Sequence, residues 1–203
     1  MKMMNNQIKW LSIGIFRDHS AYIFAGVALM VVGIAIGFAV PRSGQPLSAN
    51  PLFDGIEQLV QFYKPFEPMS VAFLFIKNSL TASIAFLTGP ILIIPAFILF
   101  FNGFVVGLIS ATLIDQVSLM APILALAPHG IFELPALVIA GAAGLRLGIS
   151  FIRKIKSKMR RTEYKLTESF ESSFRLFLFS LVLLVVAAVM ETYVTPIVIG
   201  ISP

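Results

Sequence analysis

Residues 71–114 read VAFLFIKNSLTASIAFLTGPILIIPAFILFFNGFVVGLISATLI and contain a single charged side chain, Lys77. A bilayer core of about 30 Å needs roughly 20 apolar residues in a helix, so this stretch is long enough for two crossings. Gly89-Pro90 is the natural division, because glycine permits a tight turn and proline cannot donate to the preceding helical turn. The stretch therefore predicts a helical hairpin with spans at about 71–88 and 91–114.

The same region can also be divided into two spans in a different way. It places one kinked span at 79–101 and another at 103–127, and it also gives two crossings. In the first division, the apolar residues between Asp115 and Ala127 are too few to span. They then predict a short re-entrant or interfacial helix, packed inside the fold because irregular backbone at membrane depth needs protein or water around it.

The composition of the whole chain indicates a membrane protein. The 203 residues are 58% hydrophobic and 12% charged, and the mean hydropathy is +0.92. A soluble domain keeps about a quarter of its residues charged. Cysteine is absent, which excludes disulfides, thiolate metal sites and cysteine nucleophiles. We therefore predict an all-α, polytopic helical bundle that forms a single membrane domain over residues 1–203.

Three further apolar segments complete the bundle, which gives about five transmembrane helices. The first is too long for a cleavable signal peptide. The predicted spans are 21–40, 71–88, 91–114, 131–151 and 174–195. Between the first two lies a loop, 41–70, that is rich in proline and carries charges of both signs; a short interfacial helix is expected near 52–62.

Basic residues predict the orientation of the bundle. Nine of the fifteen Lys and Arg residues fall between Arg146 and Arg175, mostly in the loop 152–173. Short basic loops stay in the cytoplasm. We therefore expect a cytoplasmic N-terminus, an outer loop at 41–70 and a C-terminus outside. The basic run has no interleaved aromatic residues, so we expect contact with membrane lipids rather than with nucleic acid.

A few polar side chains fall inside the predicted spans, where they are costly and often functional. They are Lys77, Asn78, Asn102, His129, Glu133 and Glu191. If a helix begins at Pro128, His129 and Glu133 lie one turn apart on one face and can touch. Pro135 would free the carbonyl of Ile131 and bend the helix.

His129 and Glu133 can have either a structural or a functional role. They either satisfy each other and the nearby backbone, or they accept a proton, a cation or a polar group of a partner. One His and one Glu are too few ligands for a four-coordinate zinc site. The sequence also lacks a Walker loop, an HExxH motif and a Gly-x-Ser-x-Gly motif. We therefore expect no catalytic residue, no metal and no cofactor, and an enzyme is disfavoured.

Small residues recur at a spacing of four along three of the predicted spans. Such faces let membrane helices pack closely. They include Gly33 with Gly37, Gly103 with Gly107, and the run from Ala140 to Gly148. Asn102 beside Gly103 could add an amide bond across helices. The faces could join helices within the chain or join copies of the chain into a homo-oligomer.

Several of these elements, taken in order, resemble the stage II sporulation protein M family. They are Phe75-Ile76-Lys77-Asn78-Ser79, Phe101-Asn102-Gly103-Phe104-Val105-Val106-Gly107, Pro128-His129-Gly130 with Glu133 and Pro135, and Ala140-Gly141-Ala142-Ala143-Gly144-Leu145-Arg146-Leu147-Gly148. The resemblance covers about residues 70–150. It implies a five-span membrane protein without catalysis of its own. In spore-forming bacteria the member is a scaffold that brings peptidoglycan-degrading enzymes to the engulfing septal membrane, whereas many relatives occur in organisms that make no spores.

The sequence therefore favours a non-enzymatic scaffold that recruits membrane or envelope partner proteins. The alternative is a transporter or channel subunit with a polar pathway near His129 and Glu133; a metal-dependent membrane enzyme has less support. The resemblance supplies motif positions without a catalytic role, and Glu191 joins them as an intramembrane acid. The functional candidates are His129, Glu133, Asn102, Asn78, Gly103, Gly130, Pro135 and Glu191.

Overall fold

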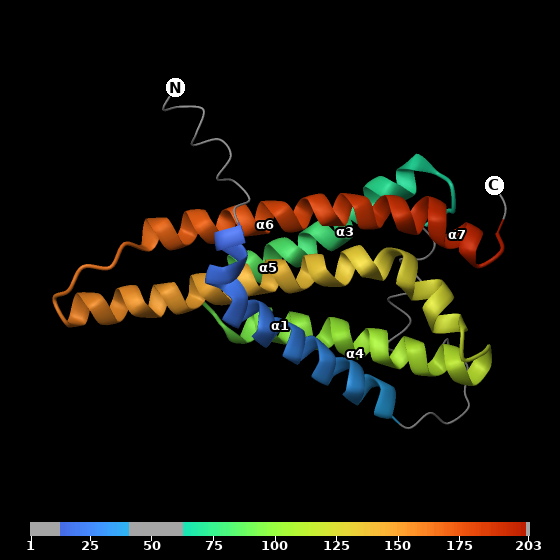
Figure 1. Ribbon diagram of the computed structural model, residues 1–203, viewed down its shortest axis with the longest axis horizontal. Helices are drawn as coiled ribbons and strands as arrows, with labels where there is room; N and C mark the ends of the chain where they lie inside the picture. Colours follow the sequence, from blue (N-terminus) through green and yellow to red (C-terminus); the bar gives the residue numbers. More distant parts are fainter. Residues whose placement is uncertain (1–12, 41–62, 202–203) are drawn as a thin grey trace.

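The computed structural model describes residues 13–40 and 63–201, apart from the side chains of Ile13 and His129. Every regular element in these ranges is helical, and five helices are long and apolar enough to cross a membrane. The predicted all-α bundle with five membrane-spanning helices is confirmed (Figure 1). The helices are α1 (Ile13–Ala39), α3 (Pro68–Leu87), α4 (Ile93–Gln116), α5 (Ala121–Met159) and α6 (Leu166–Val189), followed by the π-helix η4 (Met190–Val194) and by α7 (Thr195–Val198).

The chain turns between α3 and α4 at the predicted place. The α3 helix ends at Leu87, and the amide of Thr88 still donates to the carbonyl of Ile84, at 3.0 Å. Gly89 and Pro90 then form the turn. The second division of the sequence, with one span across 79–101, is therefore wrong. The predicted interfacial helix at 52–62 and most of the outer loop lie outside the described residues.

The fourth span differs from the prediction at its start. The segment before Pro128 is helical, as expected, but α5 runs without interruption from Ala121 to Met159 and contains both Pro128 and Pro135. The prediction that a helix begins at Pro128 is wrong, because Pro122 takes the first-turn position that suits proline. Figure 1 shows that the first part of α5 bends away from the rest, as internal prolines cause.

The α1 and α4 helices pack through their small residues. A Cβ atom on Gly103 would overlap the carbonyl oxygen of Met30, and Cβ atoms on Gly33, Gly37 and Gly107 would overlap other carbonyls across the same interface. The contacts advance in the same direction along both helices, so α1 and α4 are parallel. These glycine faces, which the sequence could assign to a homo-oligomer, are occupied within one chain.

The α3 and α5 helices are also parallel to each other. Gly144 lies against Ala85, and four residues further on Gly148 lies against Gly89. The middle of α5 is enclosed. Of an apolar 18-residue stretch within Gly130–Met159, 67% is buried, against 22% of the corresponding stretch of α1. The run of small residues in α5 therefore allows the other helices to surround it closely.

The α6 helix runs antiparallel to α3. At one end, the amide of Phe66 donates to the carbonyl of Thr192, at 3.1 Å. At the other end, the rings of Phe86 and Phe177 stack with centroids 4.7 Å apart. The helices α1, α4 and α6 thus point one way and α3 and α5 the other, which is the alternation that successive membrane crossings require.

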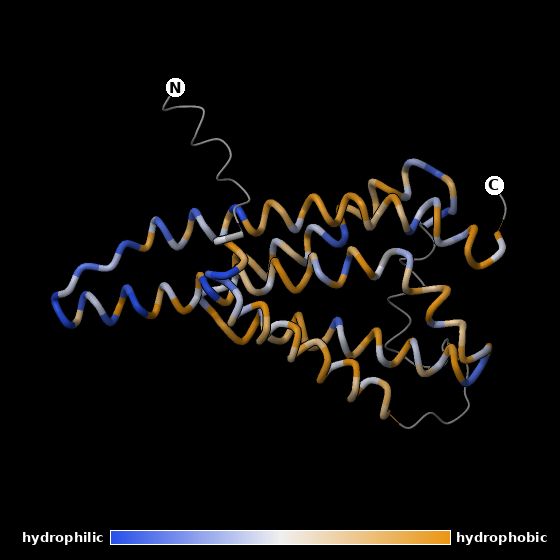
Figure 2. Tube along the Cα trace, viewed as in Figure 1, coloured by the Kyte–Doolittle hydropathy of each residue, from blue (hydrophilic) through white to orange (hydrophobic). Residues whose placement is uncertain are grey.

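One end of the bundle carries the basic residues. The end of α5 and the start of α6 extend beyond the other helices as a hairpin, and Figure 2 shows that this hairpin is hydrophilic while the bundle is apolar. A helix of 39 residues is about 58 Å long, so α5 exceeds a bilayer core of about 30 Å. The start of α1 and the turn at Gly89 lie at this same end.

Candidate functional site

The opposite end of the bundle contains a π-helix, η4, between α6 and α7. Single π-helical turns are rare and often occur at functional sites. The hydroxyl of Tyr63 donates to the carbonyl of Glu191, at 2.9 Å, and the amide of Phe66 donates to the carbonyl of Thr192. The segment that enters α3 is therefore fixed to two backbone groups of η4.

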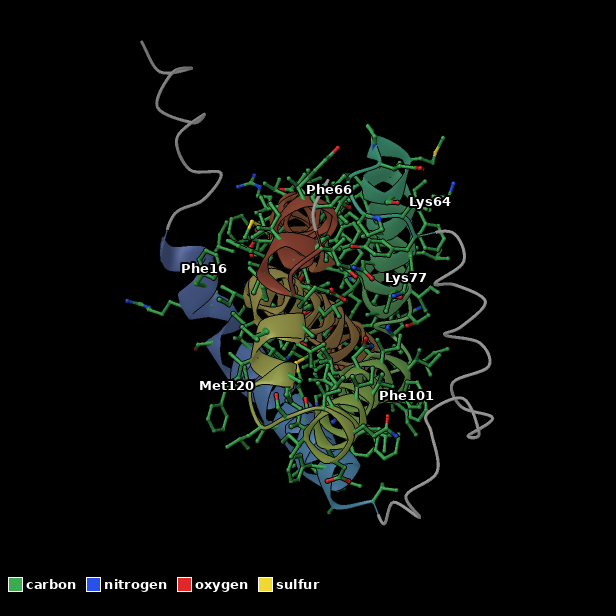
Figure 3. The ribbon with its side chains drawn as sticks, turned by 90° about the vertical axis from the view of Figure 1, so that its right-hand side faces the viewer. Phe16, Lys64, Phe66, Lys77, Phe101 and Met120 are labelled. Atoms are coloured by element: carbon green, nitrogen blue, oxygen red, sulfur yellow. The ribbon has the colours of Figure 1, made fainter. Side chains whose placement is uncertain are left out.

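Residues 63–67, which lead into α3, are held in an unusual conformation. Phe66 has φ of 65°, a left-handed conformation that is uncommon for residues with a bulky side chain. The buried hydroxyl of Ser70 accepts from the amide of Lys64 and donates to its carbonyl, both at 2.8 Å. Figure 3 looks onto this end and shows Phe66 beside the last helices, with Lys64 and Lys77 on the side of α3.

Charge is also present at this end. Glu191 is partly exposed as a residue, and its carboxyl group experiences the charge of Lys77 from α3. Burial raises the pKa of Tyr63 above its ordinary value, and the negative charge of Glu191 raises it further. Glu191, which the sequence singles out, is thus part of a junction with Tyr63, Phe66 and Lys77, which we call the η4 junction.

Two polar residues are adjacent in the middle of α3. Asn78 is 4% exposed as a residue. The hydroxyl of Ser79 is the one side-chain polar atom among the described residues that is buried without a hydrogen-bond partner. Such a group costs about 1–3 kcal/mol in a protein interior. The sequence identifies Asn78 but not Ser79.

Asn102 and Gly103 have different roles in α4. The amide nitrogen of Asn102 donates to the carbonyl of Ile98 in the same helix, at 2.8 Å, so this group does not form the predicted bond across helices. Gly103 does allow the predicted close approach, against Met30.

The bend of α5 carries four of the candidate residues. The side chain of His129 lies outside the described part of the structure, so its contact with Glu133 stays a prediction. Gly130 has open space where a Cβ would lie, and Pro135 is exposed. Neither residue is brought against another helix in the way that Gly103 is.

Two cavities flank Leu134 and Pro135 at this bend, and we call them the bend cavities. The first, of about 400 Å³, lies between α1 and α5 and includes Val27 and Val31. The second, of about 520 Å³, lies between α4 and α5 and includes Ile131. Their walls are apolar except for Ser110. They suit apolar groups that lie in the membrane.

The candidate residues whose side chains the structure describes do not form one site. Glu191 belongs to the η4 junction, Asn102 bonds within its own helix, and Pro135 lines the bend cavities. Within residues 13–40 and 63–201, no three His, Asp or Glu residues are grouped as metal ligands.

A polar cluster at the basic end is absent from the predictions. His19 of α1 is fully buried, and the Nη1 atom of Arg146 lies 2.8 Å from its Nδ1 and 3.0 Å from its Nε2. Nη1 also donates to the hydroxyl of Ser172, at 3.1 Å, and Ser173 lies 3.4 Å from Nε2. The signal in the sequence is an isolated His and an isolated Arg near span ends. His19 was missed because the predicted span begins at residue 21, whereas α1 begins at Ile13 and includes His19.

Comparisons with known proteins cover most of the chain. A family model described as stage II sporulation protein M matches residues 26–196. An uncharacterized protein of Methanocaldococcus jannaschii is 36% identical over 126 residues, which are 60% of this chain and 68% of the relative. No solved structure matches significantly.

Proposed function

Because the chain belongs to the stage II sporulation protein M family, we propose that it is a non-enzymatic membrane scaffold that recruits or organises membrane or envelope partner proteins. Membership makes it a multi-pass membrane protein of a family that is not known for enzymatic activity. A role in sporulation is not part of this proposal.

The bend cavities carry the proposal. They open on the outside of the bundle between helices that face lipid, and their walls are almost wholly apolar. Val27 and Val31 of α1 are 43% and 55% exposed beside the first cavity. A concave apolar surface at membrane depth allows close van der Waals packing, which drives association of membrane helices. The occupant that fits this surface is an apolar transmembrane helix of a partner protein.

An unpartnered hydroxyl supports recruitment in a second way. The hydroxyl of Ser79 in α3 is buried without a hydrogen-bond partner in the described chain, and polar side chains in membranes commonly bond across helices. A partner side chain that reached it would remove the cost of leaving it unsatisfied.

The alternative function, a transporter or channel subunit, needs a polar route near His129 and Glu133. The cavities on either side of this part of α5 present apolar walls instead. Apolar walls suit a helix or an acyl chain better than an ion or a polar solute.

Orientation is part of the same proposal. The basic hairpin and the start of α1 lie at one end of the bundle, and basic loops stay in the cytoplasm. The N-terminus is then cytoplasmic, and the η4 junction and the C-terminus lie on the outer side.

Co-purification from native membranes tests the recruiting surface. Val27→Trp fills the first bend cavity, whereas Val182→Trp adds the same ring to an exposed position of α6. We expect partner proteins that co-purify with the wild type to be lost with Val27→Trp and kept with Val182→Trp. Equal recovery with both variants would count against the bend cavities as the recruiting surface.

A further inference from the structure

Arg146 is a cation that is held between three helices. It projects from α5 to His19 of α1 and Ser172 of α6, and it is half-buried. Among the described residues, the ion pairs at this end of the bundle join Lys165 with Glu168 and Arg175 with Glu171. No carboxylate of the described chain pairs with Arg146.

The contacts of Arg146 require a neutral histidine ring. The Nδ1 atom of His19 lies 2.8 Å from the carbonyl of Ile15, so the tautomer that satisfies both neighbours donates from Nδ1 and leaves Nε2 as an acceptor for Arg146. A protonated ring would place two cations in contact. The charge of the guanidinium is therefore not cancelled by anything on α1, α5 or α6 that it touches.

Within the described residues, the guanidinium makes its hydrogen bonds through one nitrogen. The contacts with His19 and Ser172 all involve Nη1. The Nε and Nη2 atoms have no acceptor within the described residues. These two nitrogens form the planar fork with which arginine binds carboxylate or phosphate through two parallel hydrogen bonds.

The position of Arg146 indicates where the anion comes from. Gly148, two residues further along α5, packs against Gly89 in the turn between α3 and α4. Arg146 therefore lies at the level where two spans reach the membrane boundary, and lipid phosphates lie at that level. At that level, Arg146 thus presents a charge that no described carboxylate pairs with and two nitrogens that have no acceptor among the described residues.

We propose that Arg146 binds the phosphate group of an anionic membrane lipid, with His19 and Ser172 positioning the guanidinium. This site differs from the basic hairpin, whose charges are exposed and attract anionic lipid only diffusely. Contacts of exposed charges weaken as salt screens them, whereas a half-buried contact is screened much less. The proposal does not depend on the scaffold role.

The test uses the full-length protein in nanodiscs of phosphatidylcholine with or without phosphatidylglycerol, at high salt. Retained phosphatidylglycerol is measured by native mass spectrometry, and the melting temperature by circular dichroism. We expect Arg146→Gln to bind this lipid about tenfold more weakly than the wild type, the effect of losing a charge-assisted contact. Arg160→Gln, at an exposed position of the hairpin, is the matched control and should bind as the wild type does.

The test includes one further variant and one further ligand. Arg146→Lys retains the charge but not the fork, so it should lose part of the lipid binding even if Arg146→Gln does not fold. Inorganic phosphate added to phosphatidylcholine nanodiscs should not raise the melting temperature as phosphatidylglycerol does. Wild-type lipid binding in both Arg146 variants would overturn the site, and equal stabilisation by inorganic phosphate would overturn its assignment to a lipid.

Discussion

Gly103 of α4 lies directly against the backbone of Met30 in α1, so that no side chain fits between the two helices. This contact predicts that Gly103→Ala destabilises the protein by about 1–3 kcal/mol, the usual cost of forcing an extra carbon into a packed interior. Gly130→Ala is the matched control, because a Cβ there meets open space. Alanine is the better helix former by roughly 0.5–1 kcal/mol, so this variant should be neutral or slightly more stable.

Thermal unfolding in detergent, followed by circular dichroism, distinguishes the two glycine variants. A melting temperature for Gly103→Ala that equals that of Gly130→Ala would contradict the close α1–α4 packing.

The hydroxyls of Ser79 and Ser70 predict opposite effects on stability. Ser79→Ala removes a buried hydroxyl that has no partner in the described chain, so stability should stay the same or rise by about 1 kcal/mol. Ser70→Ala removes both bonds to Lys64 and should cost roughly 1–3 kcal/mol. Chemical unfolding of both variants in the same detergent gives the comparison. A loss for Ser79→Ala as large as that for Ser70→Ala would show that Ser79 has a stabilising partner.

The η4 junction predicts that Tyr63 ionises above its ordinary pKa of about 10. Burial and the negative charge of Glu191 both raise the pKa of its phenol. Below about pH 10, Tyr63 is neutral in the folded and unfolded states. As the pH rises from there through the folded pKa, only the unfolded state readily loses the proton, so the contribution of Tyr63 to stability is lost in that window.

Ultraviolet difference titration of the wild type against Tyr63→Phe isolates this phenol. Glu191→Gln keeps the backbone carbonyl that Tyr63 bonds but removes the charge, so the pKa of Tyr63 should fall. An unchanged pKa in Glu191→Gln would refute the electrostatic link between the two residues.

Tyr164 serves as an internal comparison at the other end of the molecule. Burial opposes its ionisation, but hydrogen bonds with Ser150, Ser169 and Arg153 outweigh burial and hold the pKa of Tyr164 below its ordinary value. Its titration should therefore precede that of Tyr63 and should not respond to Glu191→Gln.

The scaffold proposal also predicts the outcome of a transport assay. Protein reconstituted in liposomes should give no proton or ion flux that depends on His129 or Glu133, because the cavities beside this part of α5 have apolar walls. Fluorescent flux measurements on the wild type, His129→Ala and Glu133→Gln provide the check. A wild-type flux that both substitutions abolish would support the transporter alternative instead.

Much of the fold follows from the sequence because the bilayer fixes how long an apolar helix must be. The turn at Gly89-Pro90 and the enclosed position of the small-residue run in α5 are local properties of those residues. The start of α5 does not follow in this way. Pro128 suits a helix start, but so does Pro122, and in a membrane the helix continues through an internal proline when neighbouring helices or nearby polar groups satisfy the freed backbone groups.

Contacts between distant residues could not be predicted from one sequence. His19 and Arg146 are separated by 127 positions, and neither belongs to a motif with recognisable spacing. Glu191 of the η4 junction was predictable from the sequence, because a polar side chain in an apolar span is conspicuous. The geometry of the junction was not predictable, since the π-helix and the left-handed Phe66 depend on how α3 and α6 meet.

Site-specific photo-crosslinking in native membranes tests the scaffold function most directly. A photoreactive residue at position 31 lies in the first bend cavity, and one at position 182 lies on the exposed face of α6. We predict discrete adducts with partner proteins from position 31 and only lipid adducts from position 182. Lipid adducts alone from both positions, in cells that express the protein at its natural level, would contradict the claim that this surface recruits partner proteins.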